Sequence, residues 1–482
     1  MKGTRRHVVV VGGGIAGLAA AWHLHREDAT IAVTVLEGSP RVGGKLRASE
    51  IEGVLVDEGA EAMLARRPEG KELARMVGLG DHLVHPGTTG ASVWTRGALR
   101  TMPPGHVMGV PSDVVGLARS GLLSPAGLAR VPLDQILPAT LVTSDVSVAA
   151  YIRARMGSEV VDRLVEPLLG GVYAGRADLL SLEATMPHVA TAARTERSLL
   201  AAAKAISRNA PKDAGPVFTT LREGMGGLPA AVAAASGADV RTGVTARELR
   251  RTPTGWSVVT GSTRDPETIE ADAVIVAVPA PAAGRLLAAE VPKAAAELAR
   301  IEYASMAIVT LAYQRSAFPE PPSGSGYLVP SVEGRPVKAV TFSTVKWPHL
   351  AEADPGLLVL RCSIGRLGEE FVLQRDDGEL VALAMAEMAE VMGVRGLPLS
   401  TRVTRWGGAL PQYDVGHLDR VARVRAAVAV QPGLAVCGAA YDGLGVPACV
   451  ATARTAAGRV LAHLRREHEG EWREDEPAAG SR

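Results

Sequence analysis

The chain of 482 residues has few cysteines, few aromatic residues and almost no net charge. Its three cysteines, Cys362, Cys437 and Cys449, are widely separated, which argues against a disulfide framework and offers no metal-ligand spacing. We therefore expect a reducing, cytoplasmic location and no metal site. Aromatic residues make up only 4% of the chain, so alanine and valine supply much of the core volume. A net charge of +1 gives no reason to expect nucleic acid as a partner.

Long hydrophobic runs are also missing. No apolar run approaches the ~20 residues that a membrane-spanning helix requires, so we expect no transmembrane segment. The start of the chain is similar to a signal peptide, but three consecutive glycines would weaken the required helix and no cleavage site precedes His23. We interpret it as part of the mature fold. At 482 residues, two or three domains are expected.

What the chain does have is a nucleotide-binding pattern at its start. Residues 7–24 read HVVVVGGGIAGLAAAWHL, a buried strand followed by glycines and an apolar helix. Gly12, Gly14 and Gly17 fall at the spacing G-x-G-x-x-G. The first glycine allows a sharp turn, the second admits a pyrophosphate to the backbone, and the third allows close packing of helix and strand. The helix N-terminus then offers unpaired N–H groups to phosphates.

A second strand, expected over Ala32–Leu36, ends at Glu37, twenty residues after Gly17. An acidic side chain at that point would accept hydrogen bonds from an adenosine ribose. The following loop carries Arg41 and Lys45, which would bring positive charge close to a bound pyrophosphate. The alternatives are a glycine-rich turn without a ligand and a solvated basic loop.

The middle of the chain changes character twice. From Lys71 to about Ala210 the pattern is mainly helical and is typical of an inserted cap. A surface linker is expected over Ser207–Val217. Beyond about Val291 the pattern alternates strands with one clear helix, Asp377–Met392.

The end of the chain repeats the arrangement of its start. Strand Leu434–Cys437 is followed by a glycine-rich loop, Gly438–Pro447, and by helix Ala448–Arg465. A second helix N-terminus would therefore point at a ligand. If both chain ends meet on one extended ligand, FAD is favoured over a nicotinamide nucleotide.

Several stretches resemble the FAD-dependent protoporphyrinogen and coproporphyrinogen oxidases, within the flavin amine oxidase superfamily. The N-terminal pattern, SPRVGGK and CGAAYDGLGVP are general to that superfamily. The narrower matches are MPPGHVMGVP (102–111), EPLLGGVYAG (166–175), LSLEATMP (180–187), KWPH (346–349) and TRWGGALPQYDVGH (404–417). The resemblance extends nearly end to end, and the soluble Gram-positive branch is similar in these stretches.

The resemblance implies a function in haem biosynthesis. It implies FAD- and O2-dependent oxidation of coproporphyrinogen III to coproporphyrin III, a six-electron oxidation in three hydride-transfer steps with release of H2O2. Protoporphyrinogen IX oxidase is the nearest alternative. A flavin amine oxidase is more remote, because only Tyr441 in the C-terminal loop could contribute to an aromatic cage. A non-enzymatic flavoprotein that hands porphyrin on is a further alternative, and an iron-inserting chelatase is an expected transient partner.

Carried over by position, the resemblance gives a cofactor site in several pieces. Many relatives have Gly-Pro where this chain has Gly59–Ala60, so a backbone role is expected there more than a side-chain role. The expected cofactor-binding residues are Gly12, Gly13, Gly14, Ile15, Ala16 and Gly17 at the pyrophosphate, Glu37 and Gly38 at the ribose, Arg41 and Lys45 in the basic loop, Gly59, Ala60, Glu61 and Ala62 along the ribityl chain and flavin, Val244 at the adenine, Trp406 near the isoalloxazine, and Leu444, Gly445 and Val446 at its pyrimidine edge.

The substrate propionates need cations. Arg66 and Arg67, just past the flavin turn, are candidates because arginine offers a bidentate fork, although two surface arginines are the alternative. Gly170, Gly171 and Gly175 would let a flat macrocycle approach the backbone, although such glycines also end helices. No acid–base pair or nucleophile arrangement marks a catalytic residue.

We predict an α/β fold: a Rossmann-like FAD-binding domain built from both chain ends, with an inserted mainly helical region and a mixed-sheet α+β substrate domain. The expected boundaries are 1–85, 220–288 and 402–466 for the FAD-binding domain, 86–219 for the helical insertion (the substrate cap), 289–401 for the substrate-binding domain, and 467–482 for a disordered tail.

Overall fold

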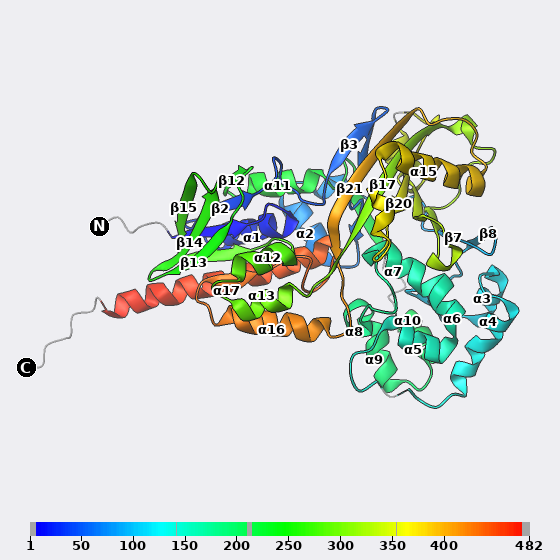
Figure 1. The fold of residues 1–482 in the computed structure, drawn as a ribbon, viewed down its shortest axis with the longest axis horizontal. Coiled ribbons are helices and arrows are strands. Elements are labelled where there is room, and N and C mark those ends of the chain that lie inside the picture. The colour runs from blue at the N-terminus through cyan, green and yellow to red at the C-terminus, as the bar shows by residue number, and fades with distance from the viewer. Residues whose placement is uncertain (1–5, 141, 210–214, 353, 475–482) are drawn as a thin grey trace, which may run out of the picture.

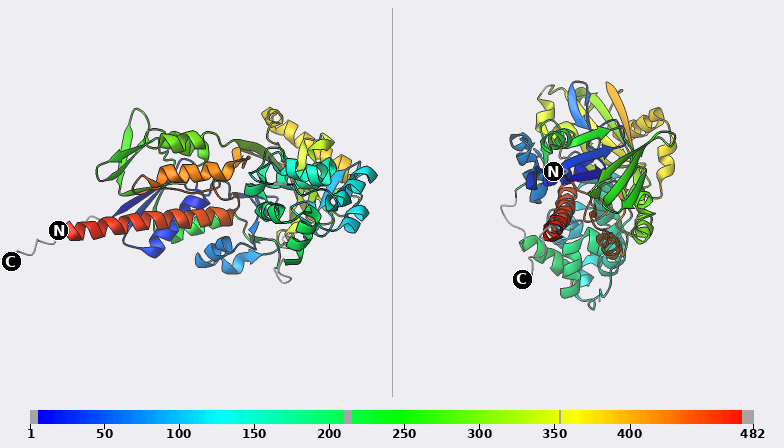
Figure 2. Two further views of the ribbon diagram at one scale, coloured as in Figure 1. Left: turned by 90° about the horizontal axis from the view of Figure 1, so that it is seen from below. Right: turned by 90° about the vertical axis from the view of Figure 1, so that its left-hand side faces the viewer.

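The computed structural model describes residues 6–140, 142–209, 215–352 and 354–474. The molecule is elongated (Figure 1). One end holds a parallel sheet with helices on both faces, and the other holds a large antiparallel sheet above a group of helices (Figures 1 and 2). The predicted combination of a Rossmann-like unit, a helical region and a second sheet is therefore present.

The parallel sheet has the strand order β12-β2-β1-β16-β22. Its strands are β1 (His7–Val11), β2 (Ala32–Glu37), β12 (Asp239–Thr242), β16 (Ala273–Val276) and β22 (Leu434–Val436). The valines of β1 are at most 4% exposed because helices cover both faces. Val8 and Val10 pack with α1 (Ile15–Glu27) and α17 (Val446–Glu474). Val9 and Val11 face the opposite layer, which contains α12 (Ala280–Leu287), α13 (Pro292–Leu298) and α16 (His417–Ala429).

The order of the strands fixes where a ligand can bind. β1 lies between β2 and β16. The chain first pairs with β1 on one side, through β2, and later on the other side, through β16, so the strand order reverses at β1. In open parallel sheets the carboxyl ends of strands at such a reversal form the ligand-binding crevice. Gly12 follows the last residue of β1 at this edge.

The other end of the molecule contains a mainly antiparallel sheet of seven strands, in the order β21-β17-β20-β19-β18-β7-β8. Helix α15 (Asp377–Met392) covers one face with Leu380, Ala384 and Met388. The strands are β21 (Ser400–Pro411), β17 (Tyr303–Gln314), β20 (Leu357–Ile364), β19 (Val337–Phe342), β18 (Gly326–Leu328), β7 (Ser92–Thr95) and β8 (Ala98–Thr101). Only β18 and β7 pair in parallel among the pairs of this sheet.

The helical region packs around its own apolar core beneath this sheet (Figure 1). Its α-helices are α3 (Val114–Ser120), α4 (Pro125–Arg130), α5 (Val148–Met156), α6 (Ser158–Val160), α7 (Glu166–Tyr173), α8 (Leu182–Thr185), α9 (Pro187–Thr195) and α10 (Leu199–Asn209). A π-helical stretch, Val161–Val165, joins α6 to α7.

Smaller elements connect the units. Hairpin β3 (Ala48–Ile51) and β4 (Val54–Asp57) leads toward the antiparallel sheet, and α2 (Pro68–Met76) packs beside α17. The remaining elements are β5 (Met63–Leu64), β6 (Leu83–Val84), β9 (His106–Val107), β10 (Val110–Pro111), β11 (Phe218–Leu221), α11 (Gly227–Ala235), β13 (Glu248–Thr252), β14 (Gly255–Gly261), β15 (Pro266–Ala271) and α14 (Ser343–Lys346).

Two sequence expectations need correction. The predicted disordered tail is wrong at its start, because α17 continues to Glu474; residues 475–482 lie outside the described residues. The predicted linker is wrong at its start, because α10 continues to Asn209; residues 210–214 are not described.

The domain boundaries stay a proposal, and strand pairing refines it at two places. β21 belongs to the antiparallel sheet, although residues 402–411 were expected in the FAD-binding domain. β7 and β8 belong to the same sheet, although they fall within the expected helical insertion. Among the described residues, no helix is both long and apolar enough to cross a membrane.

Candidate functional site

The turn between β1 and α1 has contacts that only glycine permits. Gly12 has a φ of +113°, and a Cβ there would lie 2.7 Å from the Ala277 carbonyl oxygen. A Cβ at Gly17 would clash with the Gly12 carbonyl oxygen. Gly14, the N-cap of α1, has no atom within 4 Å of a Cβ position. The N-terminus of α1 is therefore open to an anion, as the predicted pyrophosphate site requires.

Glu37 is fixed beside this turn by both of its carboxylate oxygens. They accept hydrogen bonds from the N–H groups of Gly13, at 2.7 Å, and Ser39, at 2.8 Å. An ionised carboxylate has about four acceptor positions, so capacity for ribose hydroxyl groups remains. The arrangement fits the predicted ribose contact.

The predicted adenine contact lies next to the same strand end. The N–H of Val244 donates to the Glu37 carbonyl oxygen at 2.9 Å. A contact between Val244 and an adenine would therefore use its carbonyl group or side chain. At Gly38, a Cβ would lie 3.0 Å from Oγ1 of Thr245, so the strand–loop junction is closely packed.

The two basic residues of the following loop differ in their surroundings. Arg41 donates to the carbonyl oxygens of Val42 and Gly44, at 3.1 and 2.8 Å, and thereby holds its own loop in shape. Burial lowers the pKa of the Lys45 ammonium group, and no ion pair is found for it among the described residues. Lys45 is thus the better candidate for direct contact with a cofactor.

The turn Gly59–Ala62 is attached to the antiparallel sheet. Arg361 on β20 donates to the Gly59 carbonyl oxygen at 2.5 Å and to Glu61 Oε2 at 2.6 Å. Lys346 forms a second ion pair with Glu61. Burial alone would raise the pKa of Glu61, but the charges of Lys346 and Arg361 outweigh it and lower that pKa to about 2. Glu61 therefore stays ionised and holds both cations against the turn.

Trp406 lies against the same turn from β21. Its indole Nε1–H donates to the carbonyl oxygen of Glu58 at 2.8 Å. A Cβ at Gly59 would clash with the Lys45 carbonyl oxygen, and it would also lie 3.2 Å from the Trp406 ring. The predicted backbone role of Gly59 and Ala60 is consistent with this crowding, because Ala60 also donates its N–H to Lys45 at 3.4 Å.

The two glycine-rich turns at opposite ends of the chain lie together. A Cβ at Gly438 would lie 3.9 Å from the Cβ of Ala16 in the first turn of α1. Helix α17 begins at Val446, so Leu444 and Gly445 immediately precede its first turn. The Gly445 carbonyl oxygen accepts the N–H of Cys449 at 3.0 Å. The fold thus brings two helix N-termini, those of α1 and α17, to one region.

The three substrate glycines are placed differently from expectation. Gly170 and Gly171 lie inside helix α7 and do not end it, although helix-ending glycines were the alternative from the sequence. A Cβ at Gly170 would meet nothing within 4 Å, and one at Gly171 would lie 3.7 Å from Leu328. A Cβ at Gly175 would clash with Oε1 of Gln412, so this glycine serves packing. Of the three, only Gly170 faces open space, and Gly171 lies in ordinary contact distance of Leu328.

The candidate substrate arginines also differ. Arg66 is exposed, and Arg67 pairs with Glu69 at 2.7 Å. Sequence reasoning gave them equal weight. Arg66 is the freer of the two for a propionate.

Sequence reasoning missed the open face of the antiparallel sheet. Cys362 and Val340 pack with α15, so their neighbours Ser363 and Ala339 point to the other face because strand residues alternate. Both are only half-buried although they lie mid-sheet. A strand pattern shows alternation, but it does not show which face stays open. A row of neighbouring side chains on adjacent strands crosses this face, and its last member, Leu328, lies beside Gly171. In order, the row consists of Trp406, Met306, Ile308, Ser363, Ala339 and Leu328.

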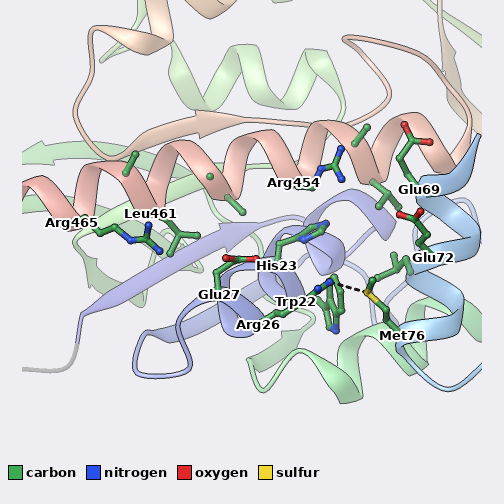
Figure 3. A pocket seen from close by; sticks show the side chains of 16 residues that line it. Trp22, His23, Arg26, Glu27, Glu69, Glu72, Met76, Arg454, Leu461 and Arg465 are labelled. Atoms are coloured by element: carbon green, nitrogen blue, oxygen red, sulfur yellow. Dashed lines mark hydrogen bonds between the residues drawn. The ribbon is translucent and has the colours of Figure 1, made fainter.

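A groove of about 510 Å³ lies elsewhere, between α1, α2 and α17 (Figure 3). It follows the C-terminal half of α1, from Trp22 to Glu27, whereas the glycine turn lies at the N-terminus of that helix. Side chains of both charge signs line it, including Arg454 and Glu69 (Figure 3). Because it lies away from the carboxyl edge of the parallel sheet, we do not assign it to the cofactor.

A family model described as flavin containing amine oxidoreductase matches residues 15–461. The chain belongs to this family. It is a flavin-dependent oxidoreductase, and the family, the enzyme class, the α/β fold class and the FAD cofactor predicted from the sequence are confirmed. The open helix N-terminus at Gly14 and the acceptor Glu37 beside it fit a flavin dinucleotide.

Several known proteins are similar to this amine oxidoreductase family member over nearly its whole length. Coproporphyrinogen III oxidase of Bacillus subtilis (strain 168) is 33% identical over 479 residues, covering 96% of this chain and 100% of the relative. Coproporphyrinogen III oxidase of Mycobacterium tuberculosis (strain H37Rv) is 40% identical over 473 residues, covering 96% and 98%. A crystal structure from Exiguobacterium sp. 255-15, provisionally named a protoporphyrinogen oxidase, is 30% identical with a TM-score of 0.85 and covers 96% of this chain and 99% of that one.

Proposed function

We propose that this enzyme oxidises coproporphyrinogen III to coproporphyrin III in haem biosynthesis, with FAD as the oxidant and O2 as the final acceptor. The observation that carries the proposal is the open face of the antiparallel sheet between Trp406 and α7. This face leads from Trp406, which bonds the proposed flavin turn, to Gly171 beside Leu328 in helix α7, where Gly170 faces open space. The names of the two curated relatives support the choice of substrate.

The residues of this chain would bind the cofactor in the following way. The N-terminus of α1 and Gly14 would hold the pyrophosphate, and Glu37 would hold the ribose. The turn Gly59–Ala62 and Trp406 would orient the flavin ring, with Leu444–Val446 at its pyrimidine edge. When bound, the flavin supplies the oxidising power, and the protein supplies position and electrostatics.

The N-terminus of α17 would favour negative charge on the pyrimidine edge. A helix N-terminus carries about half a positive elementary charge, and stabilises a nearby anion by roughly 0.3–1 kcal/mol. Burial raises the pKa of the Cys449 thiol, in the first turn of α17, to about 11, and the nearby positive charge of Lys45 opposes this rise. Both positive groups would therefore stabilise a reduced, more negative cofactor.

Coproporphyrinogen carries four propionates and protoporphyrinogen two, so cations around the open face bear on the choice between them. We propose Arg66 and Arg67 as propionate contacts, with Arg66 the stronger candidate because Arg67 is paired. Protoporphyrinogen IX oxidation is the second candidate, which the name of the Exiguobacterium protein favours.

Amine oxidation has less support. Tyr441 was the only candidate for an aromatic cage in the C-terminal loop, and it is 1% exposed within the core that contains α13 and α16. A side chain buried in that layer does not face the open surface of the antiparallel sheet.

The test compares the two porphyrinogens directly. The purified protein is incubated in air with coproporphyrinogen III or protoporphyrinogen IX, and porphyrin fluorescence and oxygen uptake are followed. We expect faster product formation from coproporphyrinogen III. A preference for protoporphyrinogen IX would favour the second candidate, and flavin-loaded protein that oxidises neither would contradict both.

Two further proposals concern the setting of the reaction. We propose a cytoplasmic location, on the grounds that Cys362, Cys437 and Cys449 are all free and buried. Cell fractionation tests it. We also propose transient contact with an iron-inserting chelatase, because the expected product is the free porphyrin; cross-linking during turnover tests this contact.

A further inference from the structure

The segment Gln412–His417 lies between the helical region and the C-terminal glycine loop. On the helical side, Gln412 Nε2 donates to the Tyr173 carbonyl oxygen at 2.8 Å. The N–H of Ser181 donates to the Tyr413 carbonyl oxygen at 2.7 Å. The N–H of Val415 donates to the Leu179 carbonyl oxygen at 3.1 Å. This side is fixed by contacts with α7 and the residues that follow it.

On the other side, the same segment holds the C-terminal loop. The hydroxyl group of Tyr413 donates to the Ala439 carbonyl oxygen at 2.6 Å and accepts the N–H of Gly443 at 2.8 Å. His417 Nε2 lies 3.1 Å from the Tyr441 carbonyl oxygen, and must donate there because a carbonyl only accepts. The backbone groups of Ala439, Tyr441 and Gly443 are thus hydrogen-bonded to the side chains of Tyr413 and His417.

Tyr413 and His417 are themselves rigidly placed. Their rings stack with centroids 3.8 Å apart and an interplanar angle of 12°. Tyr413 is 1% exposed, and its other neighbour is the ring of Tyr173 at 5.7 Å, which belongs to α7. A buried hydroxyl group with both a donor and an acceptor partner fixes the spacing of those partners, since losing it leaves two buried backbone groups unpaired.

The loop depends on such outside support. It contains Gly438 and Gly443 with φ values of +123° and +140°, conformations that glycine adopts readily and that few local contacts enforce. Its remaining side-chain contacts are at other residues: the N–H of Gly438 donates to Thr452 Oγ1 at 3.1 Å, and Asp442 forms an ion pair with Arg425 near the surface. The positions of Ala439 and Gly443 therefore depend chiefly on Tyr413.

We propose that Tyr413 is a positioning residue for the flavin: its hydroxyl group sets the C-terminal loop and thereby the placement of Leu444–Val446 and the N-terminus of α17 at the pyrimidine edge. The inference rests on the proposed cofactor contacts of those residues and deepens the proposed function. It also gives the PQYDVGH stretch a role different from substrate recognition, because the side chains of Tyr413 and His417 are bonded to the cofactor loop.

The chain supplies a matched control in Tyr441. Tyr441 lies in the same loop and is equally buried, but its hydroxyl group has no hydrogen-bond partner among the described residues. Tyr413→Phe removes two hydrogen bonds and keeps the ring, whereas Tyr441→Phe removes a hydroxyl group that makes none. Apo-proteins are titrated with FAD, the visible absorbance and circular dichroism of the bound flavin are recorded, and thermal unfolding of the apo-proteins serves as the folding control.

For Tyr413→Phe we expect a roughly 5- to 100-fold loss of FAD affinity, the range given by two net hydrogen bonds. A shifted visible spectrum of the bound flavin should accompany it. For Tyr441→Phe we expect affinity within about twofold of the parent and an unchanged spectrum. A merely structural role would lower the unfolding temperature without moving the spectrum of the flavin that remains bound.

His417→Phe is the second variant, used if Tyr413→Phe does not fold. It keeps an aromatic ring against Tyr413 and removes the bond to Tyr441, so a smaller affinity loss with a spectral shift in the same direction is expected. Equal affinity and identical spectra for Tyr413→Phe and Tyr441→Phe, or for His417→Phe and the parent, would overturn the inference. These titrations contain no porphyrinogen, so their outcome is independent of whether the proposed substrate is correct.

Discussion

At the scale of single residues, Glu37 is the side chain whose proposed function is most directly testable. It already bonds two N–H groups of the protein, so replacing it affects the turn as well as any ribose contact. For Glu37→Ala we expect FAD affinity to fall at least about tenfold, since hydrogen bonds to charged groups contribute roughly 1.5–3 kcal/mol each. Flavin titration of the apo-protein measures it. Glu37→Gln, which keeps one acceptor oxygen, should lose less, and an unchanged flavin content in both variants would refute the ribose contact.

Asp57 provides a test through pH. Burial raises the pKa of Asp57 to about 6, although the N–H groups of Met225 and Gly226 and the charge of Arg361 oppose the rise. The folded state therefore holds this proton more tightly than the unfolded chain, whose pKa is near 3.8. The stabilisation is present below pH ~3.8 and is lost as the pH rises to about 6, a loss of about 2–3 kcal/mol.

Urea unfolding at several pH values between 4 and 7 measures this dependence. Asp57→Asn stays neutral and keeps an acceptor for one of the two N–H groups, so the difference in unfolding free energy between parent and variant should change with pH in that window. Parallel pH profiles of the two proteins would show that Asp57 is not the group responsible.

Individual site residues were predictable where a backbone requirement is written into the sequence. Gly12, Gly14 and Gly17 are identified by spacing alone, because the need for glycine recurs at fixed intervals: packing requires it at Gly12 and Gly17, and ligand access requires it at Gly14. The contacts of Glu61 with Lys346 and Arg361 were not predictable, since they join residues about 285 and 300 positions apart. Arg67 pairs with Glu69, whereas no ion pair of Arg66 is found in the described part of the chain, and this difference likewise depends on rotamers that no sequence pattern encodes.

At the scale of elements, the glycines in and after helix α7 differ in their surroundings, although the sequence presented them as equivalent. Gly170 faces open space and Gly175 faces Gln412. Gly170→Leu should therefore hinder the macrocycle and raise KM for the porphyrinogen at least severalfold, while FAD affinity stays unchanged. Leucine also suits a helix interior better than glycine by about 1 kcal/mol, so the variant should not unfold more easily.

Steady-state kinetics measure the expected rise in KM of Gly170→Leu, and thermal unfolding measures its stability. Gly175→Ala is the control, because it places a side chain against Gln412 and not in open space. There the added methyl group must displace Gln412, so we expect a lower unfolding temperature. If Gly170→Leu leaves KM unchanged, the open side of α7 does not receive the substrate.

Elements with strong local signals were predicted closely. Helix α15 has the predicted bounds, because a capping aspartate, Asp376, and a closing glycine, Gly393, mark its two ends. The helical position of Gly170 and Gly171 was missed because glycine normally ends helices, and here tertiary packing of α7 overrides that preference. Strand β13 was missed because its sequence, ELRRT, is charged, and it is formed by pairing with β14.

At the scale of the whole molecule, the proposed cofactor site draws on both chain ends and on the middle. Removing FAD should therefore lower the stability of more than one unit at once. At a free concentration of 100 times Kd, binding adds about 2.7 kcal/mol, which corresponds to a rise in Tm of roughly 3–6 °C. Differential scanning calorimetry of apo- and FAD-loaded protein measures it, and a shift confined to one of several transitions would argue against a site shared by the units.

The overall architecture was predictable from order along the chain. A strand, glycines and a helix at each end indicated one discontinuous nucleotide-binding unit, and Gly438 does lie beside Ala16. The assignment of β7, β8 and β21 to one sheet was not predictable, because strands from three distant parts of the sequence meet there. Which face of that sheet remains open depends on where α15 packs, and this too is a property of the assembled fold.

The contact between the start of β1 and the distal part of α17 has a consequence for the order in which the segments of the chain can be connected. Arg6 donates to the carbonyl oxygen of Leu464 at 3.1 Å, so the start of β1 lies against the distal part of α17. Both lie at the end of the molecule opposite the helical region (Figure 2). A short linker between the region of Leu464 and Arg6 could therefore replace the segments outside them, and new ends could open at an exposed loop such as the β14–β15 turn. Such a circular permutant should fold and retain FAD, since the site depends on which segments meet in space and not on the order in which the ribosome makes them.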